Sequence, residues 1–246
     1  MIRGIDTFIF DMYGTLVDIY TDEDKPELWE QMAMHYGEAG AEYTADELKS
    51  EYHRLVEAEI ALTQFATHYD ISDDCVEPQL RNVFVRLYRQ KGVQANFKEI
   101  DETGWLFREI STERLGLYDG APELLSKLNE SERSAFLLTN AQDIFTMPEL
   151  RLLGICDAFD GILISSEAGV RKPAVQFFEM LIDKYRIDIS SAIMVGNDAV
   201  CDIMPAHELG MRSVYIHTEQ SPERPDKLPA DCTEIKSLEE LLTLYE

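Results

Sequence analysis

The sequence predicts an α/β protein, in which a parallel β-sheet is flanked by helices and an all-helical segment follows the first strand. Two observations lead to this prediction. Short, continuously apolar runs alternate with stretches of helical periodicity, which is typical of a doubly wound parallel sheet. From residue 19 to about residue 114 this alternation stops, and only helical spacing remains. We therefore expect a Rossmann-like core with an inserted all-helical cap domain.

Five apolar runs are predicted to be strands, because strands buried on both faces lack polar alternation. They are Thr7–Phe10, Ala135–Leu138, Gly161–Ile164, Ala192–Val195 and Val214–Ile216. The amphipathic stretches between them are predicted to be helices. These are Ala121–Asn129, Met147–Leu153, Pro173–Tyr185 and Val200–Leu209.

The inserted segment is predicted to contain four helices. They are Pro26–Glu38, Thr44–Ala66, Glu77–Gln90 and Phe97–Ile110. The second of them begins with Thr44 and has Glu47 three residues later, which is the pattern of a capping box. The expected division is a core domain of residues 1–18 and 115–246 and a cap domain of residues 19–114.

Composition restricts the partners of this chain. Its 246 residues carry a formal charge of −25, from 22 basic and 47 acidic side chains, so phosphate backbones and anionic membrane surfaces should be repelled. We expect no nucleic-acid or membrane partner, and an anionic substrate would need a local cation. The four cysteines are scattered and the start of the chain shows no charged-then-apolar leader, which favours a cytoplasmic protein with reduced thiols.

Polar residues stand where several predicted strands end. Asp11 follows the first strand, Thr139 and Asn140 follow the second, and Asn197 and Asp198 follow the fourth. Open α/β sheets bind ligands at the carboxyl edge of their strands, so these side chains should meet at one site. Asp202 lies four residues after Asp198, on the same face of a helix start.

The order of these residues resembles the four motifs of the haloacid dehalogenase (HAD) superfamily. The matching segments are Asp11-Met12-Tyr13-Gly14-Thr15-Leu16, Thr139, Lys172-Pro173 and Gly196-Asn197-Asp198 with Asp202. The resemblance implies a hydrolase in which Asp11 is the nucleophile and forms a covalent aspartyl intermediate. It also implies that Thr139 and Lys172 hold the transferring group, with substrate contacts from Tyr13, Gly14, Thr15, Asn140 and Asn197.

A cation is expected at this site, because three clustered carboxylates repel one another. Asp11, Asp198 and Asp202 would form that cluster, and Mg²⁺ suits hard oxygen ligands. The resemblance adds the backbone carbonyl of Tyr13 as a fourth ligand.

Tyr13 departs from the pattern of the phosphatases in this superfamily, which usually carry a second Asp there as general acid. Asp-x-Tyr-Gly-Thr is similar to the motif of the L-2-haloacid dehalogenases, whose halide leaves without a proton. Those enzymes resemble one another in a Ser-Ser-Asn motif and an early cap arginine, whereas residues 26–46 here contain no Arg or Lys. We therefore expect a Mg²⁺-dependent phosphohydrolase for a small phosphorylated metabolite.

Two alternatives stay open, namely a dehalogenase-like carbon–halogen hydrolase and a poorly catalytic phosphate-binding or partner-binding protein of this fold. For a phosphohydrolase, the missing proton donor could be one of four acids at the entry to the insert. They are Asp18, Asp22, Glu23 and Asp24. A substrate with a good leaving group would need no such acid.

Overall fold

The computed structural model describes residues 4–131 and 133–245, so residues 1–3, 132 and 246 of the expected core domain lie outside the described residues. Six parallel strands form the main sheet in the order β5-β4-β1-β6-β7-β8. The strands are β1 (Thr7–Phe10), β4 (Ser134–Thr139), β5 (Gly161–Ile164), β6 (Ala192–Gly196), β7 (Arg212–Ile216) and β8 (Cys232–Ile235). β1 lies at the centre, with Phe10 opposite Leu137 of β4 and Val195 of β6.

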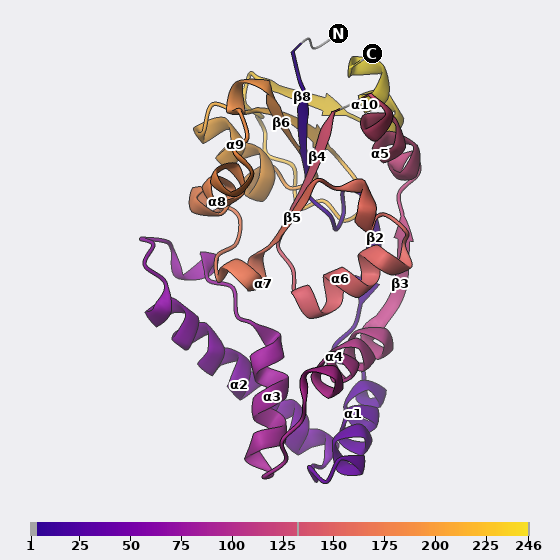
Figure 1. Cartoon of the computed structure of the whole chain (residues 1–246), viewed down its shortest axis with the longest axis vertical. Coiled ribbons are helices and arrows are strands. Elements are labelled where there is room, and N and C mark those ends of the chain that lie inside the picture. Colours follow the sequence, from indigo (N-terminus) through magenta and orange to yellow (C-terminus); the bar gives the residue numbers. More distant parts are fainter. Residues whose placement is uncertain (1–3, 132, 246) are drawn as a thin grey trace.

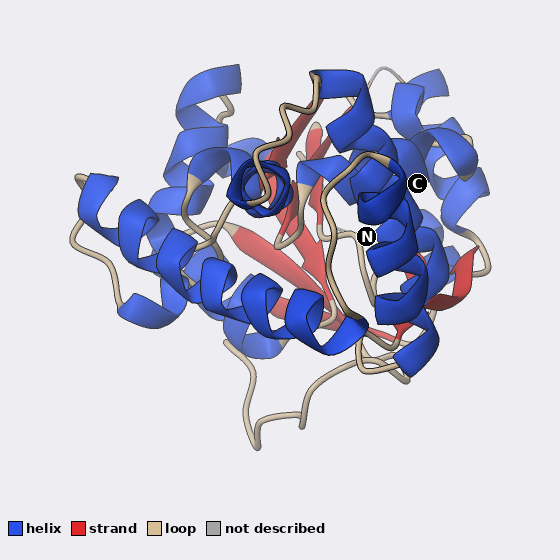
Figure 2. Ribbon diagram, turned by 90° about the horizontal axis from the view of Figure 1, so that it is seen from below, coloured by secondary structure: helices blue, strands red, loops and turns tan. Residues whose placement is uncertain are grey.

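Helices cover both faces of this sheet, as Figure 2 shows in a view from below, towards the carboxyl edge of the strands. They are α5 (Ala121–Glu130), α6 (Asp143–Leu152), α7 (Ser165–Ala168), α8 (Val175–Tyr185), α9 (Met204–Glu208) and α10 (Leu238–Tyr245). Successive residues of a strand point to opposite faces. Phe8 and Phe10 accordingly pack with α5 and α10, whereas Ile9 packs with α8 and α9 on the other face.

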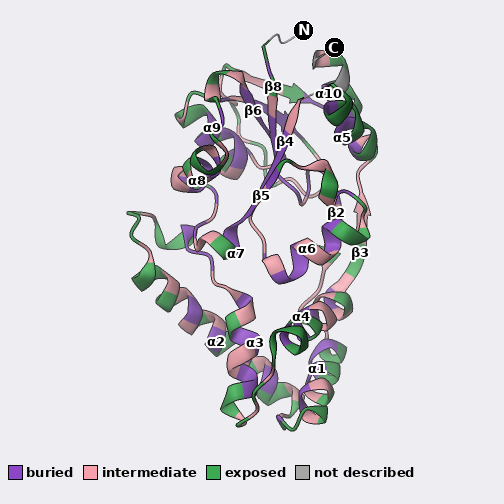
Figure 3. Ribbon diagram, in the orientation of Figure 1, coloured by how far each residue is buried: buried purple, intermediate pink, exposed green. Residues whose placement is uncertain are grey.

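A second group of helices lies beyond the carboxyl edge of the sheet, at the end of the molecule opposite both termini (Figure 1). It consists of α1 (Pro26–Glu38), α2 (Ala45–Ala66), α3 (Leu80–Gln90) and α4 (Phe97–Ser111). The antiparallel strands β2 (Val17–Thr21) and β3 (Thr112–Leu117) connect it to the sheet. These helices contain buried residues along their inner faces (Figure 3), which form an apolar cluster of their own. Ile144 and Phe145 of α6 belong to the same cluster.

The predicted fold class is confirmed, and all five predicted strands are present. The sequence analysis missed β8 and the β2–β3 pair, because their partly exposed residues form no continuous apolar run. The single helix expected over Val200–Leu209 is instead a π-helical turn, Ala199–Ile203, followed by α9. Pro205 has no N–H to bond the carbonyl of Cys201, which interrupts regular helical bonding there. No helix among the described residues is long and apolar enough to span a bilayer.

Candidate active site

A small pocket of about 180 Å³ lies at the carboxyl edge of the sheet, next to the end of β1. The residues predicted from strand ends and helix starts converge on it. Its lining consists of Asp11, Tyr13, Asn140, Lys172, Asn197, Asp198, Cys201, Asp202, Gln220 and Pro222. Thr15 is fully buried and bonds Asp11 and Asn197 of this lining. Thr139, which directly precedes Asn140, is also fully buried but does not itself line the pocket. One site therefore collects side chains that are up to 211 positions apart in the chain (Asp11 to Pro222).

Lys172 lies between two carboxylates in this pocket. Its Nζ is 2.6 Å from Oδ1 of Asp11 and 2.7 Å from Oδ1 of Asp202, and it donates to the carbonyl of Leu138 at 2.9 Å. Only 2 % of the lysine is exposed. Burial opposes its charged form, but Asp11 and Asp202 together hold the pKa of Lys172 above its ordinary value. The lysine therefore carries a fixed positive charge beside Asp11.

Asp11 is oriented from its other side by Thr15. The Thr15 hydroxyl donates to Oδ2 of Asp11 at 3.0 Å and lies 3.2 Å from Oδ1 of Asn197. Gly14 permits this close packing, because a Cβ at that position would lie 2.3 Å from Nδ2 of Asn197. Gly14 also has a φ of +82°, which favours glycine.

Asp198 and Asp202 have different partners. Oδ1 of Asp198 accepts the backbone N–H groups of Val200 and Cys201, at 2.8 and 3.0 Å, and so caps the π-helical turn. Oδ2 of Asp202 accepts the N–H of Asp198 at 3.0 Å, while its Oδ1 binds Lys172. Burial raises the pKa of Asp202, and Lys172 offsets this only in part. Each oxygen of Asp202 therefore has one protein partner, as does each oxygen of Asp11.

The oxygen donors of the pocket decide whether the expected magnesium ion could be held there. Among the described residues, no group of three or more His, Cys, Asp or Glu side chains is arranged to hold a metal ion. Asp11, Asn197 and Asp198 nevertheless line one pocket, and Mg²⁺ keeps several waters when few protein ligands are present. The donor set suits such an ion held by Asp11, Asp198 and the carbonyl of Tyr13, and Asp202, also expected as a ligand, lines the same pocket beside Lys172.

Thr139 offers a hydroxyl to an incoming group. Its Oγ1 is buried and has no hydrogen-bond partner among the described residues. Buried polar atoms are nearly always paired, so an orphan at a strand end indicates a position for a ligand atom. The side chain of Asn140 is instead bonded to the backbone of Lys172, accepting from its N–H at 2.8 Å and donating to its carbonyl at 2.9 Å.

Tyr13 is held by residues that the sequence analysis did not identify. Its hydroxyl donates to Oε2 of Glu149 on α6 and lies 3.3 Å from Oγ1 of Thr146. Oε1 of the fully buried Glu149 accepts from Nε of Arg108 at 2.6 Å. Burial and the charge of Glu149 raise the pKa of Tyr13 well above its ordinary value. The hydroxyl therefore neither ionises at neutral pH nor is available as a proton donor to a substrate.

The sequence contains one signal for Glu149. It lies four residues after Phe145, on the face of α6 that is buried, and a carboxylate in an apolar stripe requires a partner. Arg108 gives no comparable signal, because it is one of several charged residues in the last turns of a cap helix.

A larger cavity, of about 780 Å³, lies between the helical group of α1–α4 and the loops at the carboxyl edge of the sheet. It shares Tyr13 and Asn140 with the small pocket and is bounded on the cap side by α2 and Arg108. Of the four acids at the entry to the insert, only Glu23 lines it, and burial raises the pKa of Glu23. Asp18 pairs with Arg114 at 2.7 Å, and Asp24 pairs with Lys49 at 2.8 Å on the surface.

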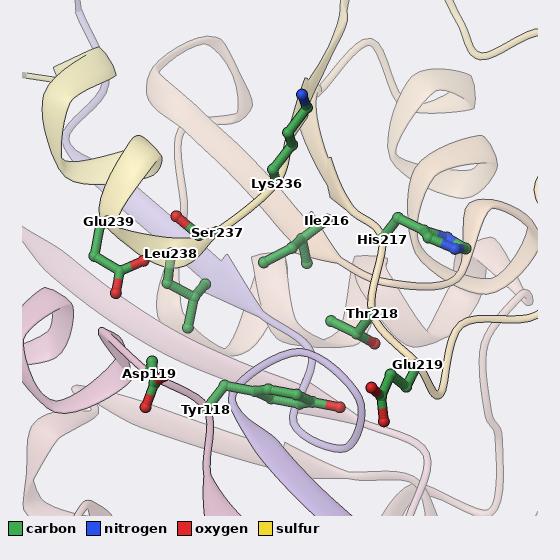
Figure 4. Close-up of a pocket in the computed structure, with 10 residues that line it drawn as sticks. All are labelled: Tyr118, Asp119, Ile216, His217, Thr218, Glu219, Lys236, Ser237, Leu238 and Glu239. Atoms are coloured by element: carbon green, nitrogen blue, oxygen red, sulfur yellow. The ribbon is translucent and has the colours of Figure 1, made fainter.

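A third hollow, of about 550 Å³, lies at the carboxyl ends of β7 and β8. Its charged lining is mixed, with Lys236 opposed by Asp119, Glu219 and Glu239 (Figure 4). Thr218 joins it to the Asp11 loop by donating to the carbonyl of Gly14 at 2.8 Å. Asp11 does not line this hollow, so it is separate from the site described above.

The family of the chain follows from comparison with known proteins. Residues 5–210 match the model of the haloacid dehalogenase-like hydrolases, so the chain belongs to that family. Within it, the chain is 28 % identical to a ribulose-1,5-bisphosphate 5-phosphatase of Halopiger xanaduensis, over 54 % of this chain and 56 % of the relative. The chain therefore spans little more than half the length of this curated relative.

Two proteins align with nearly the whole chain, but at lower sequence identity. An (S)-2-haloacid dehalogenase 4A of Burkholderia cepacia is 22 % identical, over 99 % of this chain and 96 % of the relative. The 2-haloacid dehalogenase of Pseudomonas syringae pv. Tomato superposes with a TM-score of 0.63 at 20 % identity, covering 98 % of this chain and 97 % of that one. At this identity the superposition establishes the fold alone.

Proposed function

We propose that the protein is a Mg²⁺-dependent phosphohydrolase that acts on a small phosphorylated metabolite through an aspartyl-phosphate on Asp11. The observation that supports this most is the pairing of Asp11 with buried Lys172 at 2.6 Å in one pocket. A nucleophile and a fixed cation in one pocket suit transfer of a phosphoryl group, and the unpartnered hydroxyl of Thr139, at the end of the neighbouring strand β4, could add a donor. The phosphatase relative is consistent with this class of substrate.

In this mechanism a carboxylate oxygen of Asp11 attacks phosphorus, and the bond from phosphorus to the leaving oxygen breaks. Lys172 and the Thr139 hydroxyl stabilise the charge on the phosphoryl oxygens. Water then hydrolyses the aspartyl-phosphate, which returns the Asp11 carboxylate and releases inorganic phosphate. Mg²⁺ at Asp11, Asp198 and the Tyr13 carbonyl would supply further positive charge at the same oxygens.

The leaving group needs a proton from a source other than Tyr13, whose hydroxyl is bonded to Glu149. Glu23 is the acid of the insert entry that lines the substrate cavity, and its raised pKa favours the protonated form. We therefore assign it the protonation of poor leaving groups. The helices of residues 19–114 act in this proposal as a cap domain that excludes water from the cavity.

The test is turnover of p-nitrophenyl phosphate and acetyl phosphate, with Mg²⁺ and with EDTA, by wild type and Asp11→Asn. Both substrates have good leaving groups and need no acid. We expect metal-dependent hydrolysis that Asp11→Asn abolishes. Absence of turnover would refute the phosphohydrolase, and Mg²⁺-dependent phosphate binding without turnover would indicate a binding protein of this fold.

One observation favours a second candidate, a dehalogenase-like carbon–halogen hydrolase. The sequestered hydroxyl of Tyr13 makes the phosphatase acid position inert, and a departing halide requires no proton. In this case Asp11 would displace halide from carbon and form an ester. Release of chloride from L-2-chloropropionate, lost in Asp11→Asn and insensitive to EDTA, would establish it.

A further inference from the structure

Arg108 extends from the last turn of α4 into the cavity next to Tyr13. Its guanidinium carbon lies 5.6 Å from the centre of the Tyr13 ring and 5.1 Å from that of Phe145. Only 11 % of its side chain is exposed. Two aromatic rings and Glu149 therefore hold this cation in one place, which lowers the entropy that a ligand would otherwise have to remove.

Glu149 accepts from Nε of Arg108, and among the described residues it is the one carboxylate that forms an ion pair with this arginine. Neither Nη atom belongs to the buried atoms that lack a partner in that part of the chain. Because Arg108 lines the cavity, a molecule bound there can approach its guanidinium. Burial opposes the charge, but Tyr13 and Glu149 keep the pKa of Arg108 above its ordinary value.

We propose that the substrate carries a carboxylate in addition to its phosphoryl group, and that the Nη donors of Arg108 bind this carboxylate. The inference rests on the phosphohydrolase proposed above and specifies its substrate class, a phosphorylated carboxylic acid. The geometry that carries it is the adjacency of the two cavities, with Asp11 and Lys172 in one, Arg108 in the other, and Tyr13 and Asn140 lining both. A planar guanidinium matches a carboxylate with two parallel hydrogen bonds.

The other charges of the cavity favour a singly charged group over a second phosphate. Apart from Glu23, which we propose to be protonated, three acids line it, namely Asp73, Asp74 and Glu77. Glu149 already neutralises part of the charge on Arg108. Arg171, the other arginine of the lining, bonds the carbonyl of Asp74 at 2.8 Å and faces Glu77 at 3.8 Å. A dianion would therefore meet more repulsion here than a carboxylate.

The experiment compares phosphate esters that differ in one group. Phosphoglycolate, ethyl phosphate and phosphoethanolamine place a carboxylate, a methyl group or an ammonium near the same position. 4-Carboxyphenyl phosphate and 4-nitrophenyl phosphate form a longer pair of nearly equal shape. For each substrate the ratio of kcat/KM in Arg108→Gln to that in wild type is measured, so that the reactivity of the leaving group cancels.

We expect Arg108→Gln to lower kcat/KM by about tenfold or more for at least one of the two carboxylates, through KM, and by less than about twofold for its uncharged counterpart. Arg108→Lys should restore part of the loss. Arg86→Gln is the matched control, because Arg86 is also a cap arginine paired with a buried glutamate, Glu59 at 2.6 Å, but does not line the cavity. It should leave all ratios near one.

Equal losses on all substrates, or a wild-type preference for phosphoethanolamine, would overturn the inference. If Arg108→Gln does not fold because Glu149 is left unpaired, the double variant Arg108→Gln/Glu149→Gln replaces it. If no ester is hydrolysed, the phosphohydrolase fails separately, and calorimetry still decides the carboxylate site. Phosphonoacetate should then bind wild type more tightly than methylphosphonate, and Arg108→Gln should remove the difference.

Discussion

Replacing Lys172 with Met should destabilise the protein strongly, because two buried carboxylates share this cation. Asp11 and Asp202 lie 2.6 and 2.7 Å from its Nζ, and the lysine is 2 % exposed. Breaking a buried ion pair by removing one partner costs about 3–5 kcal/mol, since it leaves an uncompensated charge. This loss is a large part of the total free energy of unfolding, which is about 5–15 kcal/mol for a folded domain. It should lower the melting temperature by roughly 10 °C.

The assay is urea unfolding in EDTA, followed by tryptophan fluorescence, on wild type and Lys172→Met. Lys172→Met/Asp202→Asn should recover a substantial part of the loss, because it removes one of the two unpaired charges. Lys184→Met, at an exposed lysine, serves as the control and should change the free energy of unfolding little. A loss below about 1 kcal/mol in Lys172→Met would refute the reasoning, because it lies far under the expected cost of a broken buried pair.

Three further predictions concern the surroundings of the site. Tyr13→Phe should lower the free energy of unfolding by about 1–3 kcal/mol, because Oε2 of Glu149 loses its donor. Turnover of p-nitrophenyl phosphate should stay within about twofold of wild type. A large loss of turnover would show that the hydroxyl is catalytic. Gly196→Ala should reduce turnover by more than about tenfold, because the new Cβ would lie 2.2 Å from Oδ2 of Asp202 and push this carboxylate away from Lys172. Unchanged kinetics would contradict this. His35 bonds Thr103 at 2.9 Å, and burial lowers the pKa of this histidine. The unfolded chain therefore binds a proton at His35 more readily than the folded chain does. The stability that the neutral histidine provides is lost as pH falls through about 6.5, the ordinary pKa of His. Unfolding from pH 8 to 5 should therefore be less pH-dependent in His35→Gln, and identical slopes would exclude the effect.

Local pattern was sufficient for most of the fold. The apolar runs before Asp11, Thr139 and Asn197 are strands in the structure, and α2 starts at the capping Thr44 as expected. The edge strand β8 escaped prediction because three of its four residues are partly exposed or exposed, and its hydrogen-bonding partner, β7, could not be read from the sequence. An edge strand owes its existence to its neighbour more than to its own residues.

The site was predictable to the extent that strand ends determine it. Placing Asp11, Asn197 and Asp198 around one pocket required only the rule that parallel strands end at one edge, whereas Lys172 was expected there from the resemblance to the HAD motifs alone. Which carboxylate takes which partner did not follow, because Asp198 and Asp202 look alike as residues four apart. The structure shows that Asp198 caps a helical turn, whereas Asp202 binds Lys172.

By itself, then, the sequence determined the α/β core, the helical insertion and the edge of the sheet where Asp11 lies, because apolar periodicity and strand ends are local properties. Only the tertiary structure decided that the Tyr13 hydroxyl is bonded to Glu149 and that a cap arginine faces the cavity. The Tyr13–Glu149 contact joins residues 136 positions apart, and Lys172–Asp11 joins residues 161 apart. Contacts of that separation depend on how the loops and helices of the core pack around the carboxyl edge of the sheet, which no local pattern encodes.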